Sequence, residues 1–204
     1  MSIIPADILQ LQKDMLAIIH WFHSRGWSPA TSTNYSFRNP GTETYTISRS
    51  GVDKSDFGPE DFMVVDRLGR PTEEYSHLKP SAETLIHTTL YQDKGINVIL
   101  HTHSVPATVL SLRCRQEGKL KLEGFELLKG LRGITTHETE LTLPVFGNSQ
   151  DMPALSAEIG ASAADISHGF LLAGHGLYTW GADIPEAKRH VEVFEFLFEC
   201  MIHL

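Results

Sequence analysis

The feature that most constrains the fold of this chain is the alternation of helix-like and strand-like segments along its 204 residues. Apolar residues recur at helical spacing between residues 5 and 25 and again between 185 and 203, so both segments are predicted to be helices. Short apolar runs bounded by turn residues lie between them, and Asn39-Pro-Gly-Thr42 is typical of a hairpin turn. Intermixed helices, strands and hairpins predict an α/β or α+β protein with a mixed or antiparallel sheet.

The predicted elements leave little of the chain without structure. No low-complexity linker or internal repeat divides the sequence, and its length is that of one domain or a tight pair. The predicted helices cover 5–25, 80–95, 105–115, 125–131 and 185–203, and the predicted strands cover 35–38, 44–48, 62–66, 97–101, 141–146, 170–173 and 177–180.

Charge and composition exclude several classes of partner. Seventeen Lys and Arg against 25 Asp and Glu give a formal net charge of −8, which is unsuited to coating a nucleic acid. No apolar run is long enough to span a membrane, and the first ten residues lack the pattern of a signal peptide. The two cysteines, Cys114 and Cys200, are too few for a disulfide scaffold or a cysteine-based zinc motif. We therefore expect a cytoplasmic protein whose partner is a small molecule, with no nucleic acid and no membrane.

Three of the eleven histidines have the spacing of a metal site. His101 and His103 are two residues apart at the end of a predicted strand, so their side chains point to the same side. His175 follows another predicted strand between two glycines, which allow a backbone or a ligand to approach closely. Three imidazoles with one open position are the layout of a catalytic zinc centre. Spacing alone leaves open that these are ordinary histidines at a strand end and in a turn.

Three loops of small residues could together bind a phosphate group. Each offers hydroxyl, amide or backbone N–H groups, and the third lies at a predicted helix start, where unpaired N–H groups favour anions. Lys54 and Lys79 could add local positive charge. Taken singly, the loops are more simply explained as turns and helix caps. Their candidate residues are Thr33, Asn34, Ser50, Gly51 and Ser81.

Two glutamates are candidates for proton transfer. Glu83 lies at the start of the predicted helix 80–95, and Glu126 lies within the predicted helix 125–131. Exposure is the ordinary situation of a glutamate, so both could be surface residues. A glutamate beside a metal could act as a general base, and burial that raises its pKa towards neutrality would suit that role.

The order of these motifs resembles the class II (zinc) aldolase family. Lys79-Pro-Ser-Ala-Glu-Thr-Leu-Ile-His87 is followed by His101-Thr-His-Ser104 and then by Ala173-Gly-His-Gly176. The segments 31–36 and 48–54 resemble the two N-terminal phosphate loops of that family, and the likeness runs from about residue 9 to 198. The resemblance implies one domain over residues 1–204 with a three-layer α/β/α fold. Its central sheet would be mixed and mainly antiparallel.

The resemblance also implies roles for individual residues. One zinc ion per subunit would lie on His101, His103 and His175. Glu83 is at the acid/base position of the aldolases, and Glu126 matches the acid/base position of dehydratases in the family, which act on a phosphorylated ketose. A homotetramer with sites at subunit interfaces is implied as well. The implied phosphate contacts are Thr33, Asn34, Ser50, Gly51, Ser81 and Lys54.

Two loops depart from the family pattern, and three interpretations of the function stay open. Ser32 and Thr33 stand where the first loop usually has glycines, and Ala82 stands where a second serine is common. Glu83 is compatible with a sugar-phosphate aldolase or a ribulose-phosphate 4-epimerase, whereas Glu126 and its neighbours favour dehydration. A non-catalytic, adducin-like binding domain is the third alternative. The presence of all three histidines and both glutamates argues against it.

Overall fold

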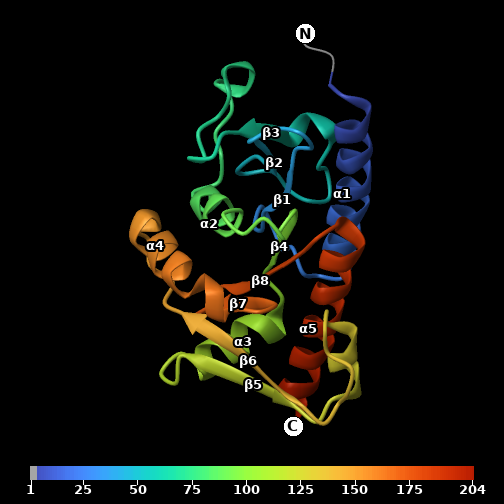
Figure 1. Ribbon diagram of the computed structural model, residues 1–204, viewed down its shortest axis with the longest axis vertical. Helices are drawn as coiled ribbons and strands as arrows, with labels where there is room; N and C mark the ends of the chain where they lie inside the picture. The colour runs from blue at the N-terminus through green and yellow to red at the C-terminus, as the bar shows by residue number, and fades with distance from the viewer. Residues whose placement is uncertain (1–3) are drawn as a thin grey trace.

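A computed structural model describes residues 4–204 of the chain and shows five α-helices and eight strands in that range (Figure 1). The strands are β1 (Tyr35–Arg38), β2 (Tyr45–Ser48), β3 (Phe62–Val65), β4 (Val98–Thr102), β5 (Lys119–Glu123), β6 (Glu140–Phe146), β7 (Gly169–Leu172) and β8 (Gly176–Gly181). The helices are α1 (Ala6–Ser24), α2 (Thr84–Leu90), α3 (Val105–Arg113), α4 (Met152–Ser162) and α5 (Ile184–His203), with short 3₁₀ helices at Pro59–Asp61, Glu73–Tyr75, Glu126–Gly130 and Ala163–Asp165.

The strands form one sheet in the order β3-β2-β1-β4-β8-β7-β6-β5. Every neighbouring pair is antiparallel except β6 and β7, which are parallel. The prediction of a mixed, mainly antiparallel sheet is therefore confirmed. Within residues 4–204 we find no helix with the length and apolar character needed to cross a bilayer.

Helices cover both faces of the sheet and make the predicted three layers. Helices α2 and α4 lie on one side, and α1 and α5 lie on the other (Figure 1). Side chains of β4 alternate between these layers: Ile99 packs in the core with α2 and α4, whereas Val98 and Leu100 pack in the core with α1 and α5. The same alternation places His101 on the α2 side, where it stacks on Tyr178.

Most predicted elements are found within a few residues of their expected bounds, but the second helix is shorter than predicted. It begins at Thr84 rather than residue 80 and ends at Leu90 rather than near residue 95. Residues 79–80 instead bond to the loop after β2: the Ser50 N–H donates to the Lys79 carbonyl at 3.1 Å. The segment predicted as helix 125–131 is a 3₁₀ helix at Glu126–Gly130.

Among the strands and α-helices given above, β5 and α4 were not predicted. Strand β5 alternates buried Leu120 and Leu122 with exposed lysines, a period of two that indicates a half-buried strand. Helix α4 carries an N-cap at Asp151, whose side chain accepts from the Ala154 N–H at 3.0 Å, and it has a proline in its first turn. Both signals are present in the sequence.

Candidate metal and phosphate site

Three histidine side chains converge beyond the carboxyl-terminal end of β4. His101 lies in β4, His103 directly follows the strand, and His175 lies in the turn between β7 and β8. One ring nitrogen of each histidine lies within 4.8 Å of the other two. The Nε2 atoms of His101 and His103 are 2.7 Å apart, and those of His101 and His175 are 3.2 Å apart. The structure thus brings together the three histidines that were predicted as metal ligands.

The surrounding groups orient two of these rings. Nδ1 of His101 donates to the Leu177 carbonyl at 2.8 Å, and its ring stacks on Tyr178 with centroids 3.9 Å apart. Nδ1 of His175 lies 3.2 Å from Oδ1 of Asn148. Because Nδ1 of His101 carries the proton that it donates to the carbonyl, Nε2 keeps a free lone pair that faces the other rings.

His101 and His103 are neutral at physiological pH. Burial lowers the pKa of His101 well below its usual value and lowers the pKa of His103 to about 4, with a further contribution from His175. Neutral imidazole is the form that binds metal ions. Nitrogens that face one another this closely need a proton or a cation between them, so this donor set fits a divalent transition metal.

Glu83 forms the fourth side of the cluster. Its Oε1 lies 2.9 Å from Nε2 of His175, and its Oε2 lies 3.8 Å from Nε2 of His101. The Asn34 amide donates to the same carboxylate and to Oγ of Ser81, the latter at 3.2 Å. Burial by itself raises the pKa of Glu83, but His101, His175 and Asn34 together hold it below its usual value. Glu83 is therefore a carboxylate.

A cavity of about 230 Å³ lies next to this cluster and includes Glu83 and His103 in its lining. Thr33 takes a left-handed backbone with φ of 70°, which side chains with a branched Cβ rarely adopt and which is often found at functional sites. The structure therefore brings the three small-residue loops and part of the histidine cluster around one space. The cavity lining includes five residues predicted to contact phosphate: Thr33, Asn34, Ser50, Gly51 and Ser81.

Lys54, the lysine predicted to contact phosphate, does not line the cavity with these loops. Lys54 is fully buried, its Nζ donates to the Val52 carbonyl at 2.9 Å, and it is absent from the described cavity lining. Burial lowers the pKa of Lys54 to about 8. Arg49, which sequence reasoning missed, does line the cavity. Its position directly before Ser50 and Gly51 was the signal that could have found it.

Glu126 is not brought to the histidine cluster within one chain. Its side chain is 69% exposed, and its carboxylate pairs with Lys129 and with Nδ1 of His137, the latter at 3.3 Å. The hydrogen bond from Lys129 is the main cause of a pKa below the usual value. The expectation of a buried glutamate with a raised pKa is thus wrong for Glu126 in the isolated chain, and the pKa of Glu83 is also lowered.

A buried carboxyl that the sequence did not reveal lies behind the cluster. Thr102, between two of the histidines, donates to Oε1 of Glu195 on α5 at 2.5 Å. Glu195 is buried, and burial raises its pKa to about 7. This hydrogen bond ties the end of β4 to α5.

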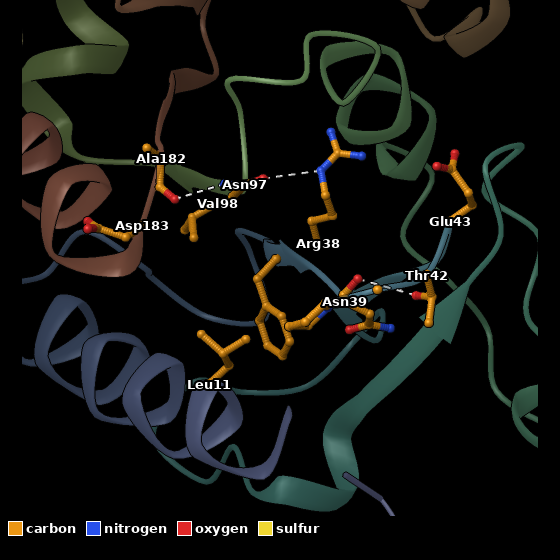
Figure 2. A pocket seen from close by; sticks show the side chains of 12 residues that line it. Leu11, Arg38, Asn39, Thr42, Glu43, Asn97, Val98, Ala182 and Asp183 are labelled. Carbon is orange, nitrogen blue, oxygen red and sulfur yellow. Dashed lines mark hydrogen bonds between the residues drawn. The ribbon is translucent and has the colours of Figure 1, made fainter. Parts of the chain in front are cut away.

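Another cavity, of about 610 Å³, lies at the opposite end of these strands (Figure 2). Its lining includes Arg38, which donates to the Tyr91 carbonyl at 2.7 Å and to Oδ1 of Asn97 at 3.2 Å. Nδ2 of Asn97 donates in turn to the Ala182 carbonyl at 3.1 Å. These polar groups are bonded to one another, and the lining contains none of the three histidines. This cavity is therefore separate from the candidate site.

Comparison with known proteins identifies the class to which this fold and site belong. The chain is a member of the family described as class II aldolase and adducin N-terminal domain, which matches residues 13–202. L-fuculose-1-phosphate aldolase from Thermus thermophilus has the same fold, with a TM-score of 0.75 and 22% identity over 96% of this chain and 95% of that one. An aldolase II superfamily protein from Pseudomonas syringae gives a TM-score of 0.78 and 18% identity over 98% of this chain and 76% of that one.

Curated relatives within this family carry a more particular name. A protein of Picosynechococcus sp. called methylthioribulose-1-phosphate dehydratase is 49% identical over 94% of this chain and 91% of its own length. A protein of Sorangium cellulosum with the same name is 44% identical over 97% of this chain and 93% of its own length. The family resemblance inferred from the motifs is confirmed by these matches.

Proposed function

We propose that this protein is a methylthioribulose-1-phosphate dehydratase, a hydro-lyase that removes water from 5-methylthioribulose 1-phosphate to give 2,3-diketo-5-methylthiopentyl 1-phosphate in methionine salvage. One observation carries the proposal: the phosphate-loop residues surround a cavity that is also lined by His103 of the histidine cluster and by Glu83, which contacts His175. The names of relatives at 42–49% identity support the reaction type.

The loops would hold the substrate by its phosphate. Hydroxyl groups of Thr33, Ser50 and Ser81 and the backbone of Gly51 offer donors to phosphate oxygens. Asn34, whose amide bonds to Ser81 and Glu83, would link the phosphate end of the cavity to the reacting end. A contact from Lys54 stays a prediction, because its ammonium would first have to leave the Val52 carbonyl.

The histidines would hold one zinc ion per subunit on the nitrogens of His101, His103 and His175. Bound there, zinc supplies Lewis acidity that stabilises negative charge on the ketone oxygen at carbon 2 when the carbon-3 proton is lost. The hydrogen bond from His101 to the Leu177 carbonyl and the stacking on Tyr178 keep that ring oriented towards the shared centre.

Proton transfer would be divided between two glutamates. A base takes the proton from carbon 3, and the carbon-4 hydroxyl leaves as water after it gains a proton, so one carboxyl can serve first as base and then as acid. We assign this role to Glu126 and an accessory role to Glu83, which lies 2.9 Å from His175. Within its own chain Glu126 pairs with Lys129 and His137 and does not reach the histidine cluster. It would therefore act on the cavity of a neighbouring subunit.

The proposal therefore includes a homotetramer with sites at subunit interfaces. Large apolar side chains are exposed on α3 and α5, including Val105 at 71% and Phe196 at 52%, and α3 begins just after His103. A second copy that covers these side chains would remove them from water. We further propose that residues 1–204 make one domain and act in the cytoplasm, where a charged sugar phosphate would be available.

The direct test is to incubate zinc-loaded protein with methylthioribulose 1-phosphate and identify the product by NMR. The expected product is the diketone. Dihydroxyacetone phosphate with a two-carbon aldehyde would indicate an aldolase, and inversion at carbon 4 would indicate an epimerase. Either result contradicts the dehydratase proposal.

Metal removal gives a second test. Dialysis against a chelator is expected to abolish dehydration, and one equivalent of Zn²⁺ is expected to restore it. Metal analysis of the purified protein distinguishes the binding-domain alternative, which predicts neither bound zinc nor turnover.

Purified Glu126→Gln protein with full turnover would contradict the role assigned to that residue.

A further inference from the structure

Positive charge beside the loops would strengthen the binding of a phosphate in the cavity next to the histidines. The chain has a formal net charge of −8, and the Glu83 carboxylate is part of the cavity lining. A phosphate monoester carries about −1.5 to −2 charges at neutral pH, so a cation beside the loops would add to the charge that the proposed zinc supplies at the reacting end. Among the described residues that line this cavity, Arg49 is the one with a permanent positive charge.

Arg49 is held in place by a buried partner. Its Nε donates to Oδ1 of Asp61 at 2.8 Å, its Nη2 lies 2.6 Å from the same oxygen, and its backbone N–H donates to the Asp61 carbonyl at 2.9 Å. Asp61 is itself fixed, because its Oδ2 accepts from the Gly58 N–H at 2.8 Å. A guanidinium that is already oriented loses little side-chain entropy when it binds a ligand.

The guanidinium still has donors to offer. Arginine carries five N–H bonds, and the contacts to Asp61 use the Nε side of the fork. No described residue accepts from Nη1, and the side chain is 37% exposed and belongs to a residue that lines the cavity. Planar N–H groups of this kind match phosphate oxygens and form strong, charge-assisted hydrogen bonds.

Lys54 is less suited to the same task. It is fully buried, its ammonium donates to the Val52 carbonyl, and it lies 5.5 Å from the ring centroid of Phe57. To reach an anion in the cavity it would have to give up these contacts. Arg49 needs no such rearrangement.

We propose that Arg49 is the residue that neutralises the substrate phosphate and makes the site prefer phosphorylated over unphosphorylated ketoses. This inference rests on the proposed function, since it assumes that the ligand of the cavity is a sugar phosphate. It assigns binding to a residue that the family motifs did not indicate.

The test compares Arg49→Met with Arg70→Met. Arg70 is a matched control because it also pairs with an aspartate, Asp66, at 2.7 Å, but it is 70% exposed and absent from the described cavity lining. Calorimetry with inorganic phosphate and steady-state kinetics are measured for both. Arg49→Met is expected to weaken phosphate binding and to raise KM roughly 10- to 100-fold, with kcat changed much less. Arg70→Met is expected to change neither by more than about twofold.

Two further variants keep the test decisive. Arg49→Met leaves Asp61 without its partner, so the double variant Arg49→Met/Asp61→Asn removes both charges and guards against misfolding. Arg49→Lys is expected to recover part of the phosphate affinity, because it keeps the charge but loses the fork. In the Arg49→Met protein the KM for unphosphorylated methylthioribulose is expected to stay near the wild-type value.

The outcomes separate this inference from the proposed function. The role of Arg49 would be overturned if the phosphate affinity and the KM of Arg49→Met stay within twofold of wild type. It would also be overturned if Lys54→Met weakens phosphate binding and raises KM while Arg49→Met does not. A wild-type protein that binds phosphate through Arg49 but does not dehydrate the substrate would instead overturn the proposed reaction and leave the role of Arg49 standing.

Discussion

At the scale of single residues, the glycine after His175 shows how tightly the site is packed. A Cβ atom on Gly176 would lie 1.9 Å from the Thr102 carbonyl oxygen and 3.3 Å from Cα of His103. The turn with His175 can therefore approach the end of β4 only because residue 176 has no side chain. The glycines beside His175 were expected to permit a close backbone approach, and the Thr102 carbonyl makes that approach at Gly176.

We predict that Gly176→Ala lowers the free energy of unfolding by about 2–3 kcal/mol, because the methyl group forces two strands apart. Gly147→Ala is the matched control, since its Cβ would meet nothing within 4 Å and its φ is not in the left-handed range. Urea denaturation of both variants measures the effect. Equal stability of Gly176→Ala and Gly147→Ala would show that the close approach is not required.

His87 provides a pH-dependent contribution to stability. Its ring is buried, with Nδ1 2.7 Å from Oγ of Ser36 and Nε2 bonded to Oδ1 of Asn34. Burial lowers the pKa of His87 from 6.5 to about 4. Above pH 6.5 the ring is neutral in both states and its full contribution is present. Below that pH the unfolded state binds the proton first, so stability falls as the pH is lowered towards 4.

We predict that the wild-type protein loses about 2–3 kcal/mol more stability than His87→Gln between pH 7 and pH 4.5. Glutamine can keep hydrogen bonds to the same neighbours but does not titrate. The measurement is the free energy of unfolding by urea at several pH values. Parallel curves for the two proteins would exclude His87 as the source of the pH dependence.

At the scale of elements, the junction between β4 and α3 joins the site to the fold. Ser104 directly follows His103 and is the N-cap of α3, where its Oγ accepts from the Ala107 N–H at 3.1 Å. Thr108, one turn into the helix, donates to the His175 carbonyl at 2.9 Å. The first turn of α3 therefore continues the segment that carries His101 and His103 and contacts the turn that carries His175.

We predict that Ser104→Ala destabilises the protein by about 1–2 kcal/mol through loss of the cap, and that Ser104→Thr restores most of this. Ser162→Ala serves as the control, because Oγ of Ser162 is exposed and bonds back to the Glu158 carbonyl at 3.2 Å without capping a helix. Thermal or urea unfolding measures all three variants. A stable Ser104→Ala protein would mean that α3 does not depend on its cap.

Element prediction failed where the local signal was weak or the partner was distant. The alternation in β5 spans five residues, Lys119–Glu123, and becomes meaningful when β6 pairs with it. The segment before Thr84 has helix-forming residues, yet residues 79–80 bond to the loop at Arg49 and Ser50. A contact between segments about 30 residues apart overrides local propensity in this case.

At the scale of the whole molecule, the proposed acid/base group requires a second copy of the chain. Val105 and Phe196 leave apolar surface exposed, and Glu126 pairs with residues away from the histidines. We predict that the mass in solution, measured by light scattering, is four times that of one chain. A monomer would contradict the shared site.

Hybrid oligomers test whether the site is shared. Glu126→Gln and His103→Gln proteins are each expected to be inactive, and co-expressed hybrids purified through two different tags are expected to regain up to about a quarter of wild-type activity. Activity returns because some interfaces combine an intact histidine cluster with an intact Glu126. Hybrids that contain both kinds of subunit and still have no activity would contradict the sharing of Glu126.

The sequence by itself determined the class of fold, the family and the identities of the three histidines. These follow from local periodicity, from the two-residue spacing in His101-Thr-His103 and from the glycines around His175, which are properties of neighbouring residues. The five phosphate-loop residues that line the cavity were also named from local loop chemistry.

Only the tertiary structure decided which charged side chains lie beside the site. It buried Lys54 against Val52, held Arg49 at the cavity through Asp61, tied Thr102 to Glu195, and left Glu126 exposed. The exposure and pairing of a charged side chain depend on segments far away in the sequence, because burial and partners are set by packing across the sheet. Residue type and spacing cannot contain that information.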